Sequence, residues 1–294
     1  MDKLCVAVAM AWFRSAPARL RGTVLGRQLW DGSALDGKTI LVYPEQGVGD
    51  TIQFARYLPL VEALGGRVIF EVPKTLDRLF KGSRFAEISV AAEKTPPPFD
   101  CHAPLLDLPR LLNTTLQTIP VCDSYLETPP ELREVWADRI GPGENIRVGI
   151  VWAGNPKHAN DRNRSIEGAL FRPLTEISGV STYSLQVGRD GESTKIIGDR
   201  ATDIAPFLTD FAETAAAMRN LDLIVTADTS VAHLAGTLGT PVWTLLPYIP
   251  DWRWLLERED SPWYPSMRLF RQSAIGDWAG VFENVEKALR GFRA

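Results

Sequence analysis

The stretch LDLIVTADTSVAHLAGTLGTPVWTLL, residues 221–246, decides the fold of this chain. LDLIVTA (221–227) is an apolar run typical of a buried strand, and PVWTLL (241–246) is a second run of the same kind. Between them, SVAHLAGTLG (230–239) has the composition of a helix and ends on a glycine. A strand, a helix and a second strand in this order predict two parallel strands joined by a right-handed crossover.

The same alternation of strands and helices extends over most of the chain. Helical spacing over 51–64 ends at Gly65-Gly66, which is a typical helix stop. The other predicted helices cover 74–81, 211–220 and 278–292, and the other predicted strands cover 39–43, 67–72, 87–92, 101–106, 147–152 and 181–187. The pattern therefore predicts an α/β protein with parallel sheets and Rossmann-like halves.

A Pro-, Gly- and charge-rich segment interrupts the alternation at TPPELREVWADRIGPGEN (128–145) and indicates a domain boundary. We expect a Rossmann-like N-terminal domain over residues 1–140 and a second over 141–275. The last segment, 276–294, would form a helix that packs back on the first domain. Ligands bind beyond the carboxyl ends of parallel strands, so two sheets that face each other would create a cleft between the domains.

Composition excludes several kinds of function. The 294 residues carry a net charge of −4 with a pI near 5.5, which argues against a nucleic-acid partner and allows at most peripheral membrane contact. Three cysteines without CxxC spacing fit free thiols in a reducing, cytoplasmic location. Three histidines that lie far apart and the absence of any DxD pair predict that no metal is bound.

The N-terminus allows three readings. LCVAVAMAWF (4–13) has the length of the apolar region of a signal peptide and is too short to span a bilayer. The ordinary reading of such a stretch is a helix that packs on the domain, or the remnant of a preceding helical module. The sequence leaves these readings open.

The corner between the strand at 221–227 and the helix at 230–239 is a candidate phosphate site. Asp228, Thr229 and Ser230 form the turn, and His233 lies on the first turn of the helix. Helix N-termini offer unpaired N–H groups and a partial positive charge, and hydroxyl and imidazole groups add further partners for a phosphate. The competing reading is an ordinary capped helix with a packed histidine.

Two further segments lie at the same predicted edge of the sheet. AGNPKHANDRNRS (153–165) follows a buried strand and includes Asn155 and Arg164, of which the arginine could clamp a diphosphate. Gln186 ends the strand at 181–187 and could bind a base or a ribose. The competing readings are a solvated basic loop and a glutamine that faces solvent.

The loop PEQGVGDTIQF (44–54) contributes Gln46, Gly47, Gly49 and Asp50 at the first strand-to-helix corner of the N-terminal half. Asp50 either complements the helix dipole or acts as a catalytic base, and GVGD is not a dinucleotide-binding fingerprint because Ile52 stands where the third glycine belongs. Late in the chain, a Trp-rich loop with Trp252 could stack on a sugar, although such aromatics more often pack the loop itself.

These segments together resemble a known family. VGDTIQFARYLPL (48–60) and ADTSVAHLAGTLGTPVW (227–243) resemble motifs of family 9 glycosyltransferases, the ADP-heptose:lipopolysaccharide heptosyltransferases. Over residues 28–272 the order of blocks is similar to the glycosyltransferase domain of bacterial proteins with tetratricopeptide repeats upstream. A more distant likeness joins it to O-GlcNAc transferases.

The resemblance implies a GT-B fold and an inverting, metal-independent transfer from a nucleotide-diphosphate sugar, without cofactor, to a hydroxyl of a glycan, lipopolysaccharide core or protein. It implies Asp50 as the base, and Asp228, Thr229 and His233 near the diphosphate. Ser230 departs from the glycine usual in the family, and Arg164 replaces a lysine. An upstream helical-repeat module would be a partner.

Two other functions remain open from the sequence alone. The chain could be a catalytically inactive GT-B module that only binds a nucleotide or glycan, or a GT-B sugar-nucleotide epimerase or hydrolase. Release of nucleoside diphosphate would distinguish a transferase from a pure binding module, and product analysis without acceptor would reveal the epimerase or hydrolase.

Overall fold

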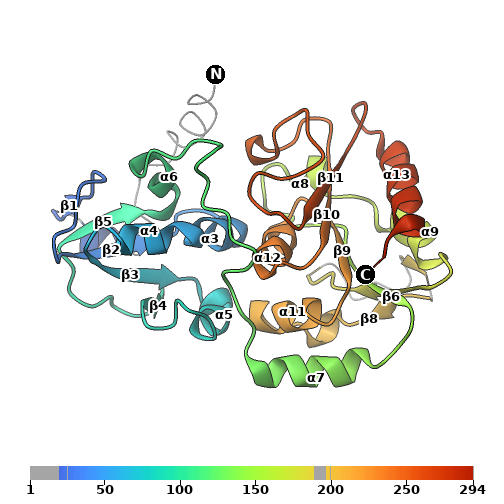
Figure 1. Ribbon diagram of the computed structural model, residues 1–294, viewed down its shortest axis with the longest axis horizontal. Helices are drawn as coiled ribbons and strands as arrows, with labels where there is room; N and C mark the ends of the chain where they lie inside the picture. The colour runs from blue at the N-terminus through green and yellow to red at the C-terminus, as the bar shows by residue number, and fades with distance from the viewer. Residues whose placement is uncertain (1–19, 25, 189–196, 199, 294) are drawn as a thin grey trace. The chain divides into compact units, whose positions relative to one another are not determined.

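The computed structural model describes residues 20–24, 26–188, 197–198 and 200–293. The apolar stretch 4–13 lies outside the described residues. The chain divides into two compact units, Met1–Val121 and Cys122–Ala294. Each unit contains its own parallel sheet with helices on it (Figure 1), as the alternating sequence pattern predicts.

The first unit has a five-stranded sheet in the order β1-β5-β2-β3-β4. All its strand pairs are parallel, and Ile40 of β2 pairs with Val68 of β3 and Cys101 of β5. The central β2 is buried along its apolar residues. The strands are β1 (Gln28–Leu29), β2 (Thr39–Tyr43), β3 (Arg67–Val72), β4 (Ser89–Ala91) and β5 (Cys101–Pro104).

The helix expected over 51–64 begins earlier and is divided. α3 covers Val48–Phe54, a 3₁₀ turn η2 covers Ala55–Tyr57, and α4 covers Leu58–Glu62. Pro59 lies at the start of α4, where its missing N–H cannot continue the hydrogen-bond ladder of α3. Gly65, with a φ of +83°, ends the segment as predicted.

Short helices complete the first unit. They are α2 (Arg21–Val24), η3 (Lys74–Leu76), α5 (Asp77–Lys81), η4 (Leu105–Asp107) and α6 (Leu108–Leu111). Leu20 and Val24 pack on one face of the sheet against Leu41, Tyr43 and Ile69. The carboxyl ends of the parallel neighbours β2 and β5 lie at the same edge of the sheet, and the loop to α3 begins there.

The second unit has a six-stranded parallel sheet in the order β11-β10-β9-β6-β7-β8. β6 and β9 are neighbours at its centre, with Val151 opposite Thr226. The strands are β6 (Ile146–Val151), β7 (Val180–Ser184), β8 (Thr202–Asp203), β9 (Leu223–Ala227), β10 (Val242–Leu246) and β11 (Met267–Arg271). The sequence reading missed β1 and β8, which are two residues long, and β11, a stretch to which it assigned no element.

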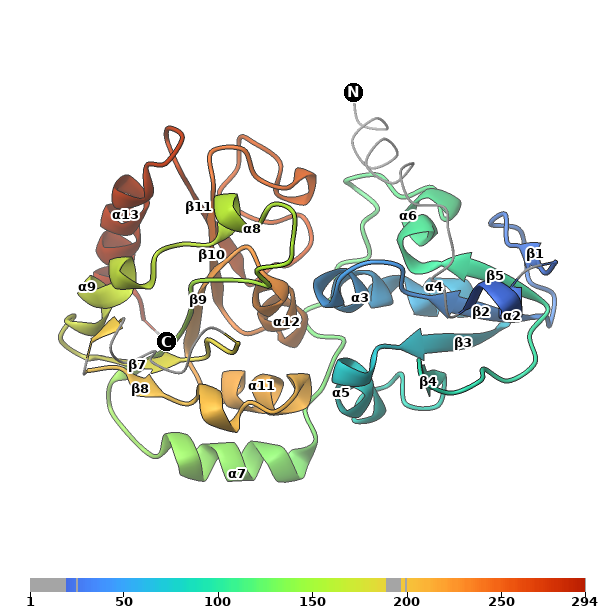
Figure 2. The same ribbon diagram turned by 180° about the vertical axis from the view of Figure 1, so that it is seen from behind.

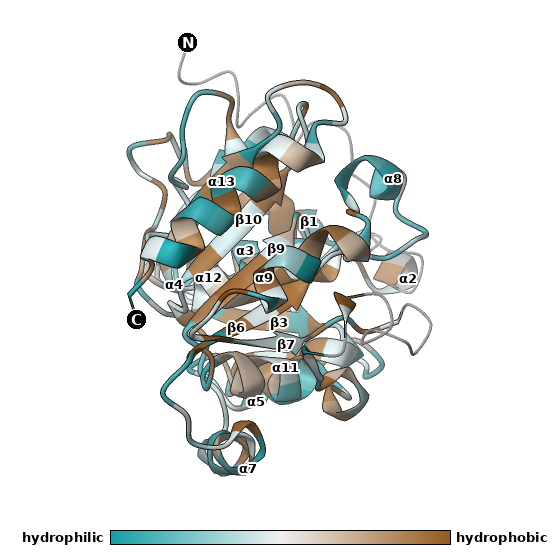
Figure 3. Cartoon of the chain, turned by 90° about the vertical axis from the view of Figure 1, so that its right-hand side faces the viewer, coloured by the Kyte–Doolittle hydropathy of each residue, from teal (hydrophilic) through white to brown (hydrophobic). Residues whose placement is uncertain are grey.

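Helices cover both faces of this sheet (Figures 1 and 2). α11 (Phe211–Met218) and α12 (Ser230–Leu238) lie on one face, and η5 (Gly168–Phe171), α9 (Arg172–Thr175) and α13 (Trp278–Gly291) lie on the other. α13 carries alternating apolar and polar residues (Figure 3), and its buried residues join a core with the strands.

The terminal helix α13 was expected against the first unit, and the structure corrects this placement. Phe282 of α13 meets Phe171 edge-on with ring centroids 4.8 Å apart, and Val285 is fully buried in the core of the second unit. Its apolar face is thus occupied by η5, α9 and the adjacent sheet. Among the described residues, no helix is long and apolar enough to cross a membrane.

The division between the units lies between residues 121 and 122, ahead of the expected boundary at 140/141. The segment taken for a linker contains a helix, α7 (Pro130–Ile140), that packs on α11. Trp136 of α7 is fully buried and donates from Nε1 to Oε2 of Glu213 at 2.7 Å. Proline at the first turn of a helix is favourable, so the prolines here start α7.

Candidate functional site

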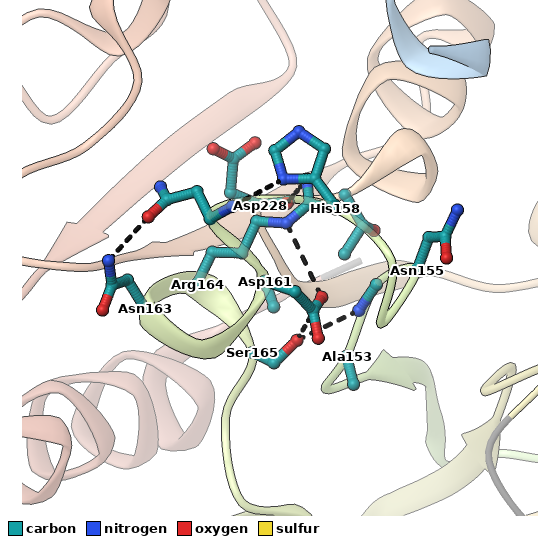
Figure 4. A network of polar contacts seen from close by, with 12 residues as sticks. Ala153, Asn155, His158, Asp161, Asn163, Arg164, Ser165 and Asp228 are labelled. Atoms are coloured by element: carbon teal, nitrogen blue, oxygen red, sulfur yellow. Dashed lines mark hydrogen bonds and ion pairs between the residues drawn. The ribbon is translucent and has the colours of Figure 1, made fainter.

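The candidate site of the second unit lies at the carboxyl ends of β6 and β9. Residues 228–230 connect β9 to α12, and the loop after β6 leads into α8 (Asp161–Arg164). Because β6 and β9 are hydrogen-bonded neighbours, the two loops leave the sheet side by side (Figure 4). This is the edge at which parallel α/β sheets bind ligands.

The N-terminus of α12 is capped as predicted by a hydroxyl. Thr229 has extended backbone angles, and its Oγ1 accepts a hydrogen bond from the N–H of Val231 at 3.2 Å. Thr229 is buried, whereas Ser230 is partly exposed and its hydroxyl has no partner among the described residues. The nine-residue helix thus presents its positive end and one unused hydroxyl at the strand edge.

Arg164 reaches this corner from α8. Its Nη1 donates to the main-chain oxygen of Asp228 at 3.0 Å, and its Nε lies 3.9 Å from Oδ1 of Asp161. Asp161 is itself fixed, because Oγ of Ser165 donates to it at 2.9 Å (Figure 4). The Arg164 side chain is only 16% exposed, and its buried Nε has no hydrogen-bond partner among the described residues. The guanidinium is thereby oriented with one donor unused.

Gly154 provides the space for this arginine. A Cβ built on Gly154 would lie 2.7 Å from Nη2 of Arg164. The backbone N–H of Gly154 donates to Oγ of Ser165 at 3.3 Å, which closes the loop on itself. Glycine is therefore required here by close approach, since Gly154 has no unusual backbone angles.

The carboxyl group of Asp228 is buried under the corner. Burial raises its pKa, and the guanidiniums of Arg253 and Arg164 and the indole of Trp254 oppose this effect only in part. Its main-chain oxygen holds Arg164. The contacts therefore give Asp228 a positioning role at the turn.

His233 lies inside an aromatic enclosure on the first turns of α12. Its ring stacks on Trp254 with centroids 5.4 Å apart, and its Nδ1 lies 3.0 Å from the hydroxyl of Tyr264. His233 is 3% exposed. A Cβ on Gly236 would lie 2.5 Å from Cγ of Tyr264, so this glycine lets the tyrosine pack on the helix. The orientation of His233 therefore depends on two aromatic residues from the loop after β10.

Gln186 and Asn155 are held by their own loops. Oε1 of Gln186 accepts from the N–H groups of Trp152 and Ala153, and Nε2 donates to the carbonyls of Ala153 and Val187. The buried amide thus joins the ends of β6 and β7. Gln186 therefore neither faces solvent nor offers its amide to a base, and both expectations from the sequence were wrong for this residue. Asn155 is exposed, and its Oδ1 accepts from the N–H of Lys157.

The Trp-rich loop mostly packs on itself. Trp254, Trp263 and Tyr264 are at most 1% exposed. Trp252 is partly exposed in the 3₁₀ turn η7 (Trp252–Trp254), where it meets Trp263 edge-on and has the Arg253 guanidinium over its ring. Of these aromatics, Trp252 has the most surface available for a sugar.

The predicted loop of the first unit connects β2 to α3. Asp50 is the third residue of α3, and its Oδ2 accepts from the N–H of Gly47 at 3.0 Å. Gly49 lies inside the helix, and Gln46 is exposed in the loop before it. The carboxylate is partly exposed and caps its own helix, so it stands at the carboxyl edge of β2 as expected.

Glu45, which sequence reasoning did not select, stands beside Asp50. Its Oε1 accepts from the N–H of Leu106 at 3.3 Å, and its Oε2 is buried without a partner among the described residues. Burial raises the pKa of Glu45 to about 8, and the charges of Asp107 and Asp50 act in the same direction. Glu45 is therefore mostly protonated at neutral pH.

Several site residues carried no sequence signal. Asp161, Gly154 and Glu45 act through contacts that only the folded chain displays, with Arg164, with Ser165 and with Leu106. Over the described parts of the chain, no group of three or more His, Cys, Asp and Glu residues could hold a metal ion.

Comparisons with known proteins find related sequences. The profile of glycosyltransferase family 9 (heptosyltransferase) matches residues 192–266, which include β9, α12 and β10. Protein FlbA of Caulobacter vibrioides is 29% identical over 296 residues, which cover 90% of this chain. The chain spans about half of that curated relative, 48% of its length.

Solved structures share the fold. E. coli ADP-heptose LPS heptosyltransferase II aligns with a TM-score of 0.58 at 14% identity, over 86% of this chain and 98% of the other. A family 9 glycosyltransferase from Veillonella parvula aligns with a TM-score of 0.60 at 12% identity, over 88% and 92%. E. coli heptosyltransferase WaaC with ADP-2-deoxy-2-fluoro heptose reaches 0.52 at 10% identity, over 85% and 99%. The two-sheet α/β architecture is thus that of GT-B heptosyltransferases.

Proposed function

We propose that this chain is a glycosyltransferase that moves a sugar from a nucleotide-diphosphate donor to a hydroxyl acceptor. The observation that carries the proposal is the corner at Arg164 and α12. A guanidinium is oriented there with one unused donor, beside a helix N-terminus and an unused serine hydroxyl. These groups match the charge and hydrogen-bonding needs of a diphosphate.

In this proposal the second unit binds the donor. Arg164, Ser230 and the first N–H groups of α12 stabilise the diphosphate as negative charge develops on it during departure. His233 supports the same edge from its aromatic enclosure. Stabilisation comes from the guanidinium and the helix dipole, so the proposed mechanism requires no metal.

The first unit supplies the base in the same proposal. Asp50 removes the proton of the acceptor hydroxyl as that oxygen attacks the anomeric carbon, and the nucleoside diphosphate leaves from the opposite side. This single displacement inverts the anomeric configuration. General-base assistance is typically worth about 10²–10⁴-fold in rate.

The acceptor in this proposal is a glycan, a lipopolysaccharide core or a protein. The curated relative FlbA is about twice as long as the matched region, which supports a domain that acts together with another module. We propose a helical-repeat module upstream as that partner, from the resemblance of the chain to repeat-containing transferases.

The experiment is a binding panel followed by turnover. A nucleotide at a thousand times its Kd should stabilise the protein by about 4 kcal/mol, measured as thermal shift with the diphosphates UDP, ADP and GDP and with the monophosphate CMP. The best ligand then defines the donor series for transfer assays. If none of the diphosphates shifts unfolding and none of their sugars is consumed, the proposal fails.

A pure binding module is the second candidate, because the Asp50 carboxylate is engaged as a helix cap. Such a module would bind the nucleotide and release no nucleoside diphosphate from any donor. A transferase would release it in proportion to the acceptor consumed, so a coupled assay for the released diphosphate separates the two.

A further inference from the structure

A cavity of about 320 Å³ is lined in part by Arg162 and Asn163 of α8, the helix that also carries Arg164. Segments after β10 and β11, the start of α13 and α8 itself form its walls, all within the second unit. Its volume is at the lower end of the range typical of small-molecule sites, about 300–1,000 Å³. The residues that line it are Arg162, Asn163, Pro247, Tyr248, Ile249, Gln272, Ile275, Gly276 and Trp278.

Gln272 contributes an oriented and unused hydrogen-bond donor to this cavity. Its side chain is 95% buried, and its Oε1 accepts from the N–H of Tyr248 at 3.0 Å and from the N–H of Gly276 at 3.2 Å. These two bonds fix the amide plane. Nε2 has no acceptor among the described residues, and a donor left in this position favours a ligand that carries an acceptor.

The side chains that line the cavity include a positive charge and no negative charge. Arg162 is exposed and forms no ion pair with any described residue, and no Asp or Glu lines the cavity. Asn163, the other polar group of α8 in the lining, donates to Asn160 at 2.7 Å. In a chain with a net charge of −4, a cavity with an unpaired cation and an unpaired amide donor selects an anionic group.

The remaining walls are apolar and unusually exposed. Tyr248 is 47% exposed, Ile249 71% and Ile275 81%, and Trp278 is partly buried beside them. Exposed apolar side chains gathered at one site are typical of ligand contact. Aromatic rings next to a polar donor and a guanidinium suit a sugar ring, which has one apolar face and a polar edge.

We propose that this cavity binds a sugar that carries a carboxylate. The carboxylate accepts hydrogen bonds from Nε2 of Gln272 and from the guanidinium of Arg162, and the ring lies against Tyr248 or Trp278. The assignment deepens the proposed function, since the identity of the ligand as a sugar rests on it. Arg162 and Arg164 lie on the same four-residue helix, so the anionic sugar and the diphosphate are held from adjacent positions.

Titration calorimetry and ligand-detected NMR with D-glucuronate test this assignment. We expect saturable binding with a Kd of the order of 1 mM and no saturation by D-glucose or by the methyl ester of glucuronate. Arg162→Gln removes the cation. Gln272→Glu keeps an oxygen to accept from the two N–H groups, but it removes the donor and adds a negative charge. Each variant should weaken glucuronate binding about tenfold or more.

Arg290→Gln is the matched control, because Arg290 is an exposed arginine of α13 outside the cavity lining. It should leave glucuronate binding unchanged. Equal binding of glucose and glucuronate, or full glucuronate binding by both cavity variants, overturns the assignment. Nucleoside diphosphate binding is measured on the same samples. If the glucuronate tests fail while nucleotide binding is retained, the cavity assignment is overturned and the proposed transferase function is not.

Discussion

The guanidinium of Arg164 donates from Nη1 to the main-chain oxygen of Asp228 at 3.0 Å. This bond joins the loop after β6 to the turn that starts α12, across two neighbouring strands. It orients the arginine before any ligand is present, and preorganised charge costs no rearrangement on binding.

Arg164→Lys should weaken the binding of the preferred nucleoside diphosphate about tenfold to a hundredfold. A lysine has a single ammonium group, so it cannot hold the Asp228 oxygen and bind a phosphate in the planar geometry of arginine. Hydrogen bonds to charged groups are worth about 1.5–3 kcal/mol, which corresponds to that range. Calorimetry measures the change. Unchanged affinity would exclude Arg164 from the diphosphate site.

Gly154→Ala should weaken the same binding by displacing Arg164, because the added Cβ would lie 2.7 Å from Nη2. We expect a loss of about threefold to tenfold, with little change in melting temperature, since the atom displaced is the end of a side chain. Gly143→Ala is the matched control, because its Cβ would meet nothing within 4 Å. Equal affinities of the two variants would contradict the role given to Gly154.

Asp50→Asn should lower kcat by about 10²–10⁴-fold while nucleotide affinity and melting temperature stay near those of the wild type. An asparagine oxygen still accepts from the N–H of Gly47, so the helix cap is kept and only the basicity is lost. Steady-state kinetics and thermal unfolding are measured together. Retained turnover would show that Asp50 has only the capping role.

Gly236→Ala should destabilise the second unit by roughly 1–3 kcal/mol, because its Cβ would overlap the Tyr264 ring at 2.5 Å from Cγ. Displacing that ring also removes the contact between the Tyr264 hydroxyl and Nδ1 of His233. Denaturant unfolding measures the loss. Gly291→Ala, with open space at its Cβ, should be near neutral, and similar behaviour of both variants would contradict the packing argument.

Glu45 should make the folded protein less stable as pH rises. Burial raises its folded pKa to about 8 from an ordinary value of 4.5, so the folded state retains a proton that the unfolded chain loses. The stabilisation of the folded state by protonated Glu45 is fully present below about pH 4.5 and is lost as pH approaches 8. Glu45→Gln should therefore match the wild type near pH 4.5 and exceed it at pH 8 by roughly 3–5 kcal/mol, since one pKa unit corresponds to about 1.4 kcal/mol. Denaturant unfolding at both pH values checks this, and a constant difference would exclude Glu45 as the cause.

The sequence predicted the strands β2 and β3 residue for residue, because each is a short apolar run between polar turns. It also predicted a hydroxyl cap for α12, at Thr229 or Ser230, and the structure assigns the cap to Thr229. Short elements at sheet edges were missed, since a two-residue strand such as β8 has no periodicity. The segment of α7 was predicted to be a linker because its prolines and charged residues are typical of a linker. Its helix is anchored mainly by the buried side chain of one tryptophan.

The site was only partly predictable for a related reason. Hydroxyls, arginines and acids at strand ends are visible in one sequence, so Arg164 and Ser230 could be selected. Their environment depends on residues from other loops. The side chain of Gln186 is hydrogen-bonded to backbone groups of the loop after β6 and of its own strand end. Glu45 became notable only because folding encloses one of its oxygens.

The anchoring of residues 122–140 determines where a fragment of this chain can be cut. Trp136 is bonded to Glu213, and the N–H of Tyr125 donates to the carbonyl of Thr237 near the end of α12. A recombinant C-terminal piece that starts at 141 would lose both attachments and uncover the apolar surface of α11. A piece that starts at 122 keeps both attachments, so the second unit retains its complete interior in it.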